Sequence, residues 1–267
     1  MFYRKQLLLE MALVWRINMN YSIRSSSQKG ATLIIVLIML LLITIVGTWA
    51  IRGSITSLNI ATNTQAQALL KQSSDAVFFK LENDTSNDLT LANMQIGDGI
   101  LAYLLRAENK GKELVFCVRG NVANNWEGAR QGSIVYWQGS TINNRELGAN
   151  GFCQTTRSSD FTSGRQAVLT RVAIRVAPNN KDFGHMVDGD DKAGKGKDIS
   201  TVIVNATSLL PNLSTATDAQ VNNCISNFTT FVDGSLNNET VIDCLSRNNI
   251  PYSSQEMVYT LRAVKSS

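Results

Sequence analysis

Residues 29–51, KGATLIIVLIMLLLITIVGTWAI, decide the fold class of this chain. From Ala31 to Ile51 the stretch has 21 residues without a charge, Asn, Gln or Pro. As an α-helix it would be about 31 Å long, enough to cross a hydrocarbon core of about 30 Å. Because lipid offers the backbone no hydrogen-bond partners, a helix is the form that this stretch can adopt there.

Two other structures compete for the same stretch. A secretory signal peptide has an apolar region of about 7–15 residues that ends at a small-residue cleavage site. The stretch from Ala31 to Ile51 is longer, and Trp49-Ala50-Ile51-Arg52 matches such a site poorly. A helix in the core of a soluble domain would usually keep a polar face, which this stretch lacks. The sequence therefore predicts a membrane helix.

The charges before the helix predict its orientation. They are mostly basic: Arg4, Lys5, Arg16, Arg24 and Lys29 stand against Glu10. Short positive flanks stay in the cytoplasm, so the C-terminal part is expected in the periplasm. Both Met1 and Met19 remain candidate start residues for this leader.

Without the leader the chain carries no formal net charge. The 267 residues include 25 basic and 21 acidic side chains, and removing the leader leaves 20 of each. Proteins that bind nucleic acids usually present a basic patch. We therefore expect no strong nucleic-acid binding by the exported part.

The membrane helix is expected to continue beyond the lipid. From Arg52 to Glu82 there is no proline and Gly53 is the only glycine, and apolar residues recur at helical spacing. Gly47 and Gly53 are the expected weak points of the helix. The predicted organisation is a leader at 1–30, a transmembrane helix at 31–51, its continuation at 52–82 and a folded domain at 83–267.

Short runs of β-branched and aromatic residues follow the helix, separated by clusters of Gly, Asn and Asp. They predict an α+β fold, in which the long helix packs on an antiparallel sheet. Two short helices, at 218–228 and 239–246, belong to a disulfide-tied C-terminal region. The expected strands are 113–118, 133–137, 167–176, 201–204 and 257–263.

The four cysteines, Cys117, Cys153, Cys224 and Cys244, all follow the membrane helix. An even number of cysteines in an oxidising compartment favours disulfides. Three pairings exist, of which we favour the pairing of sequence neighbours. Zinc binding fits poorly, because no pair has C-x-x-C spacing and the chain has a single histidine.

The residues before the apolar stretch resemble a prepilin cleavage motif, since Gln28-Lys29-Gly30 places a basic residue and a glycine directly before it. In type IV pilins and type II secretion pseudopilins, prepilin peptidase cuts after this glycine and N-methylates the new terminus. The resemblance covers about residues 27–81 and is strongest to the PilX group of minor pilins. It implies cleavage between Gly30 and Ala31.

Two positions depart from the usual pilin pattern. Most pilins carry glutamate as the fifth mature residue, whereas this chain has Ile35. In the family that carboxylate pairs with the terminal amine of the subunit above, so its absence implies a place at the filament tip. Placement by hydrophobic packing alone is the alternative. The chain also lacks the proline that kinks many pilin helices, and Arg52-Gly53 occupies that region.

No motif in the chain indicates catalysis, and we expect neither enzymatic activity nor a cofactor. Gly189–Lys195 matches the start of a phosphate-binding loop, but Gly196 stands where Ser or Thr is required. The acidic residues between 182 and 198 form either a charged turn or a calcium site, which the sequence leaves open. His185 has no nucleophile pattern near it.

The resemblance implies a minor pilin that helps to prime a type IV pilus and sits at or near its tip, with roles in adhesion, twitching motility and DNA uptake. Its expected partners are other minor pilins, the major pilin, a tip adhesin, prepilin peptidase and inner-membrane lipid. The protein would reside in the inner membrane and then in the pilus. A type II secretion minor pseudopilin and a signal-anchored periplasmic enzyme or binding protein are the alternatives.

Overall fold

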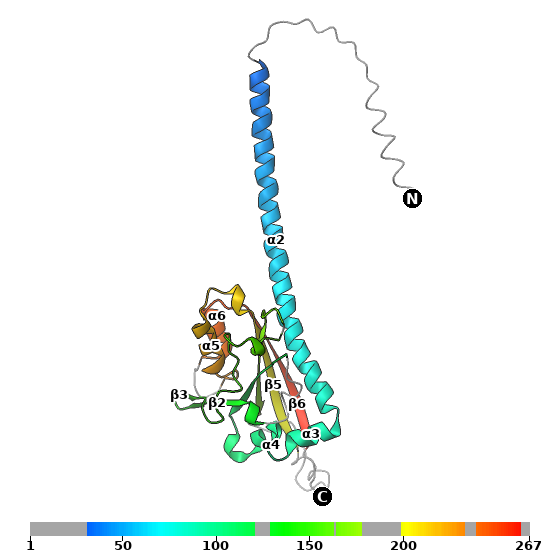
Figure 1. The fold of residues 1–267 in the computed structure, drawn as a ribbon, viewed down its shortest axis with the longest axis vertical. Coiled ribbons are helices and arrows are strands. Elements are labelled where there is room, and N and C mark those ends of the chain that lie inside the picture. The colour runs from blue at the N-terminus through cyan, green and yellow to red at the C-terminus, as the bar shows by residue number, and fades with distance from the viewer. Residues whose placement is uncertain (1–30, 121–128, 163, 178–198, 233–238, 263–267) are drawn as a thin grey trace, which may run out of the picture. The chain divides into compact units, whose positions relative to one another are not determined.

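The computed structural model of the protein describes residues 31–120, 129–162, 164–177, 199–232 and 239–262 (Figure 1). The chain divides into two compact units, Met1–Asn59 and Ile60–Ser267. The described part of the first unit is helical throughout, and the second unit contains the sheet.

One helix, α2 (Ala31–Thr85), accounts for 55 residues and belongs to both units. It contains no proline, and it passes through Gly47 and Gly53 without a break. Such a length far exceeds that of an ordinary helix in a globular domain. The predicted long N-terminal helix is confirmed, and it ends at Thr85.

Six antiparallel strands form the sheet, in the order β3-β2-β1-β4-β5-β6. Strand β5 pairs with β6 along its whole length, from Ile199↔Arg262 to Leu209↔Tyr252. The predicted α+β fold is therefore confirmed. The strands are β1 (Glu113–Cys117), β2 (Ser133–Gln138), β3 (Thr141–Asn143), β4 (Leu169–Val176), β5 (Ile199–Leu209) and β6 (Tyr252–Arg262).

The second half of α2 packs on one face of this sheet (Figure 1). Its buried residues recur at the spacing of a single helix face, and they are Ala66, Leu70, Ser74, Val77, Phe78 and Leu81. Apolar side chains of β4 and β5 complete this core. Hydroxyl groups add polar contacts between helix and sheet: Ser74 Oγ donates to Ser208 Oγ at 2.9 Å.

A second layer covers the opposite face of the sheet. It consists of two short helices, α5 (Asp218–Ser226) and α6 (Val241–Arg247), which pack on Leu169 and Leu209 (Figure 1). Strand β4 is therefore enclosed on both sides, and its residues from Leu169 to Ile174 are all buried. This explains why its sequence alternates only in part.

Several elements differ from the sequence prediction. Two helices between α2 and the sheet, α3 (Asp88–Gln95) and α4 (Ile100–Leu105), were not predicted, and neither was the short edge strand β3. Strands β5 and β6 are longer than expected, because much of their length is polar. Short 3₁₀ helices occupy Ala107–Asn109, Ala129–Gln131, Ser158–Asp160 and Pro211–Leu213.

Candidate functional site

The apolar half of α2 has no packing partner among the described residues of its own unit. Large apolar side chains along it are exposed on every side, from Leu33 at 68% to Ile51 at 60%. It is long and apolar enough to cross a membrane. A surface of this kind needs lipid or other helices around it.

Two threonines within this apolar stretch have hydroxyl groups that are satisfied inside the helix. Thr44 Oγ1 donates to the carbonyl of Leu41, and Thr48 Oγ1 donates to the carbonyl of Ile45, both at 2.8 Å. A hydroxyl bonded in this way can enter lipid without an unpaired donor. The threonines are therefore compatible with a membrane location.

The helix surface is indented at its two glycines. A methyl group added at Gly47 or Gly53 would meet no atom within 4 Å. Neither glycine is therefore required by packing within the described chain. Small residues on a membrane helix allow the backbone of a second helix to come close.

The processing position predicted from the sequence is only partly described. Helix α2 begins at Ala31, whereas Gly30 lies outside the described residues. Ile35 is 58% exposed on the first turns of α2. The sequence of α2 has its first acidic residue at Asp75, so no carboxylate is present near the start of the helix.

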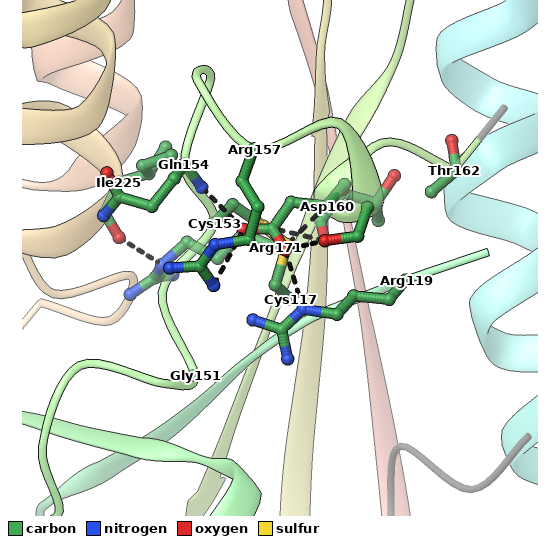
Figure 2. The surroundings of a disulfide bond; sticks show 12 residues. Cys117, Arg119, Gly151, Cys153, Gln154, Arg157, Asp160, Thr162, Arg171 and Ile225 are labelled. Carbon is green, nitrogen blue, oxygen red and sulfur yellow. Dashed lines mark hydrogen bonds and ion pairs between the residues drawn. A yellow bond between two sulfur atoms is a disulfide. The ribbon is translucent and has the colours of Figure 1, made fainter. Parts of the chain in front are cut away.

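The first disulfide, Cys117–Cys153, joins β1 to the segment before β4 across a Cα–Cα distance of 4.9 Å (Figure 2). A buried carboxylate lies beside it. Asp160 Oδ1 is 2.7 Å from Arg119 Nε, and Asp160 Oδ2 accepts a hydrogen bond from the backbone of Gln154 at 3.0 Å. Together these contacts fix the disulfide loop to the sheet.

Gly151 allows the same loop to approach the sheet closely. A Cβ atom at this position would lie 2.2 Å from the backbone nitrogen of Ser133 and 2.3 Å from the carbonyl oxygen of Val115. Both neighbours are backbone atoms, which cannot rotate away. Only glycine fits against this pair of strands at this point.

The second disulfide, Cys224–Cys244, joins α5 to α6 with a Cα–Cα distance of 5.5 Å. Both helices begin with a capping box, in which Thr217 pairs with Gln220 and Thr240 pairs with Asp243. The hydrogen bonds from Thr240 hold the pKa of the Asp243 carboxyl below its ordinary value. The two bridges join sequence neighbours, and at these separations each contributes very roughly 3 kcal/mol to stability.

A buried ion pair connects this helical pair to the sheet. Glu113 on β1 accepts hydrogen bonds from the backbone nitrogens of Thr230 and Phe231, both at 2.8 Å. Arg171 on β4 donates through Nε to the carbonyl of Ile225 at 3.0 Å. Burial raises the pKa of Glu113 and lowers the pKa of Arg171 to about 10.

The motifs with possible chemistry in the sequence lie outside the described residues. These are the phosphate-loop-like Gly189–Lys195, the acidic residues between 182 and 198, and His185. Within the described ranges, no group of three or more His, Cys, Asp or Glu side chains is placed to hold a metal ion.

The sequence did not lead us to expect charged side chains buried in the domain. Glu113, Asp160 and Arg171 are each at most 1% exposed. The burial of Arg171 could have been suspected from the sequence, because Arg171 stands among apolar residues in a predicted strand. The residues of β4 on both sides of it are buried. The burial of Asp160 could not be predicted, since its closest ionic partner, Arg119, is 41 positions away in the sequence.

A long apolar N-terminal helix, followed along the chain by an antiparallel α+β domain, is the organisation that the sequence resemblance leads us to expect. Residues 29–79 match a family model described as PilX N-terminal. These residues therefore form a PilX-like, type IV pilin-like N-terminal segment. The match ends before the first strand, and comparison with curated proteins and with solved structures finds no match.

Proposed function

We propose that the protein is a minor pilin that helps to prime a type IV pilus and acts at or near its tip. The observation that carries this proposal is the exposed apolar surface of α2 from Leu33 to Ile51, within the segment that matches the PilX N-terminal family. Prepilin peptidase would cut between Gly30 and Ala31. The freed helix would then exchange lipid for the helices of other pilins.

The tip position rests on Ile35. In a filament of stacked helices, the carboxylate of a fifth-position glutamate would receive the terminal amine of the subunit above. An unpaired charge within lipid costs at least about 2.5 kcal/mol. A subunit with Ile35 offers no carboxylate to a neighbour above, but its own amine at Ala31 can still be neutralised from below.

The sheet domain would present a fixed surface outside the membrane. One disulfide ties the loop before β4 to β1, the other joins α5 to α6, and the buried pair of Glu113 and Arg171 holds the helical layer on the sheet. Such a domain suits the selection of neighbouring minor pilins, the major pilin and a tip adhesin. Adhesion, twitching motility and DNA uptake would follow from assembly rather than from catalysis.

A deletion strain tests this function. Loss of surface pili and twitching, with normal exoprotein secretion, is the expected result. Complementation with the wild-type chain should restore pili, whereas a Gly30→Leu chain, which prepilin peptidase should not cut, should fail. Loss of exoprotein secretion with normal pili would instead indicate a type II secretion pseudopilin. Restoration by the uncut chain would indicate an anchored periplasmic enzyme or binding protein.

A further inference from the structure

A cationic and aromatic pocket lies at one end of the strands of the sheet, where β1 begins and where β2 and β4 end. Its volume is about 280 Å³. The C-terminal segment that follows α5 closes one side of it. Its lining combines Lys110, Lys112 and Arg175 with the rings of Trp137 and Phe231.

The charges of this pocket do not cancel. Lys112 Nζ is neutralised by Glu146, whose Oε1 is 2.7 Å away. The charge of Glu113, the acidic lining residue, is offset by Arg171, whose Nη2 is 3.9 Å from Glu113 Oε2 and which lies outside the lining. Lys110 is exposed, and together with Arg175 it leaves a positive surplus that favours an anion.

Arg175 is held in position but incompletely bonded. Its guanidinium carbon lies 4.4 Å from the centroid of the Phe231 ring, a stacking contact that fixes the plane of the group. Its Nε is buried and has no hydrogen-bond partner in the part of the chain that the structure describes. A buried donor without an acceptor is unusual, and a ligand oxygen would satisfy it.

Trp137 supplies a fixed apolar surface beside this cation. Its Nε1 donates to Thr229 Oγ1 at 3.0 Å, which anchors the indole to the C-terminal segment. The side chain is half-buried and lines the pocket. A large ring held by its polar end presents its apolar face to a ligand.

We propose that this pocket binds one acidic sugar unit, a pyranose ring that carries a carboxylate. The planar donors of Arg175 match a carboxylate, and the apolar face of a pyranose can pack on Trp137. Pockets for drug-sized ligands measure about 300–1,000 Å³, so about 280 Å³ accommodates little more than one ring. A nucleotide is larger, and strong binding to a nucleic acid needs a longer basic track.

This site is a property of the folded sheet domain and does not depend on the role in assembly. Methyl β-D-glucuronide should bind the full chain in detergent micelles, as measured by ligand-observed NMR titration. Methyl β-D-glucoside, which differs only in lacking the carboxylate, should bind far more weakly. Arg175→Gln should weaken glucuronide binding at least about tenfold, because a charge-assisted hydrogen bond is lost.

The matched control uses two exposed lysines. Lys110→Gln should weaken binding severalfold, whereas Lys71→Gln, on α2 and outside the pocket lining, should leave it unchanged. If Arg175→Gln does not fold, the proposal is tested by comparing the glucuronide affinities of Lys110→Gln and Lys71→Gln. Equal affinity for glucoside and glucuronide, equal effects of the two lysine variants, or tighter binding of inorganic phosphate or a dinucleotide would overturn the proposal. None of these results would alter processing at Gly30.

Discussion

Glu113 and Arg171 face each other inside the protein, with Glu113 Oε2 and Arg171 Nη2 3.9 Å apart and side chains 2% and 1% exposed. Glu113 also accepts a hydrogen bond from the backbone nitrogen of Thr230, between α5 and α6, and Arg171 donates to the carbonyl of Ile225 in α5. The two charges therefore attach the helical layer to the sheet from adjacent strands. Burial makes either charge costly without the other.

Glu113→Gln should destabilise the domain by about 3–5 kcal/mol, because Arg171 keeps a buried charge without its partner. Denaturant unfolding of the full chain in detergent at pH 7 measures this change. Glu146→Gln makes the same chemical change at the more exposed pair with Lys112 and should cost at most about 1 kcal/mol. Similar losses for both variants would contradict the anchoring role.

Gly151→Ala tests the close approach of the first disulfide loop to the sheet. The added methyl group would overlap backbone atoms of Ser133 and Val115, so we expect a loss of at least about 2 kcal/mol in the free energy of unfolding. Gly164→Ala is the control, since a methyl group there meets no atom within 4 Å. Equal unfolding midpoints for the two variants would contradict the close approach.

Asp243 should make the stability of α6 depend on pH in acid. Thr240 Oγ1 and the Thr240 nitrogen donate to Asp243 Oδ2 at 2.7 and 2.9 Å, and these bonds lower the pKa of the carboxyl. Its contribution is present above the ordinary pKa of about 3.9 and is lost as the pH falls through the lower folded value.

Asp243→Asn should therefore be less stable than wild type at pH 7, by less than about 1 kcal/mol because the carboxyl is exposed. Thermal unfolding between pH 7 and pH 2 should show this difference shrinking below about pH 4. A difference that stays constant over the whole range would show that the carboxylate charge does not contribute.

The sequence predicted the elements whose pattern is local. The uncharged run from Ala31 to Ile51 indicates a helix whatever surrounds it, and the β-branched runs at Glu113–Cys117 and Ser133–Gln138 appear as strands. The polar halves of β5 and β6 were not recognised. They are strands because each pairs with a neighbour, a relationship that a single segment does not encode.

The buried polar contacts depended on the tertiary fold and could not be predicted. Ser74 and Ser208 are 134 positions apart in the sequence, but their hydroxyl groups form a hydrogen bond with each other. The pocket beside Arg175 likewise draws Trp137 and Phe231 from separate segments. Local periodicity carries no information about such pairs.

Ile35→Glu should change where the subunit sits in a filament. A carboxylate at this position could neutralise the terminal amine of a subunit above, which would allow incorporation away from the tip. Quantifying a tagged chain against the major pilin in sheared filaments should show a severalfold increase in copies. Ile34→Glu adds the same charge at a different helix angle and should not increase incorporation. An unchanged copy number for Ile35→Glu would favour placement by helix packing alone.

The proposed assembly role depends most directly on the release of α2 at Ala31. Intact-mass measurement and N-terminal sequencing of the native protein, from cells with and without prepilin peptidase, test this release. The proposal predicts an N-methylated chain that begins at Ala31 in the first cells and an uncut leader in the second. A chain that keeps its leader in both, or begins at another residue, would contradict the filament role.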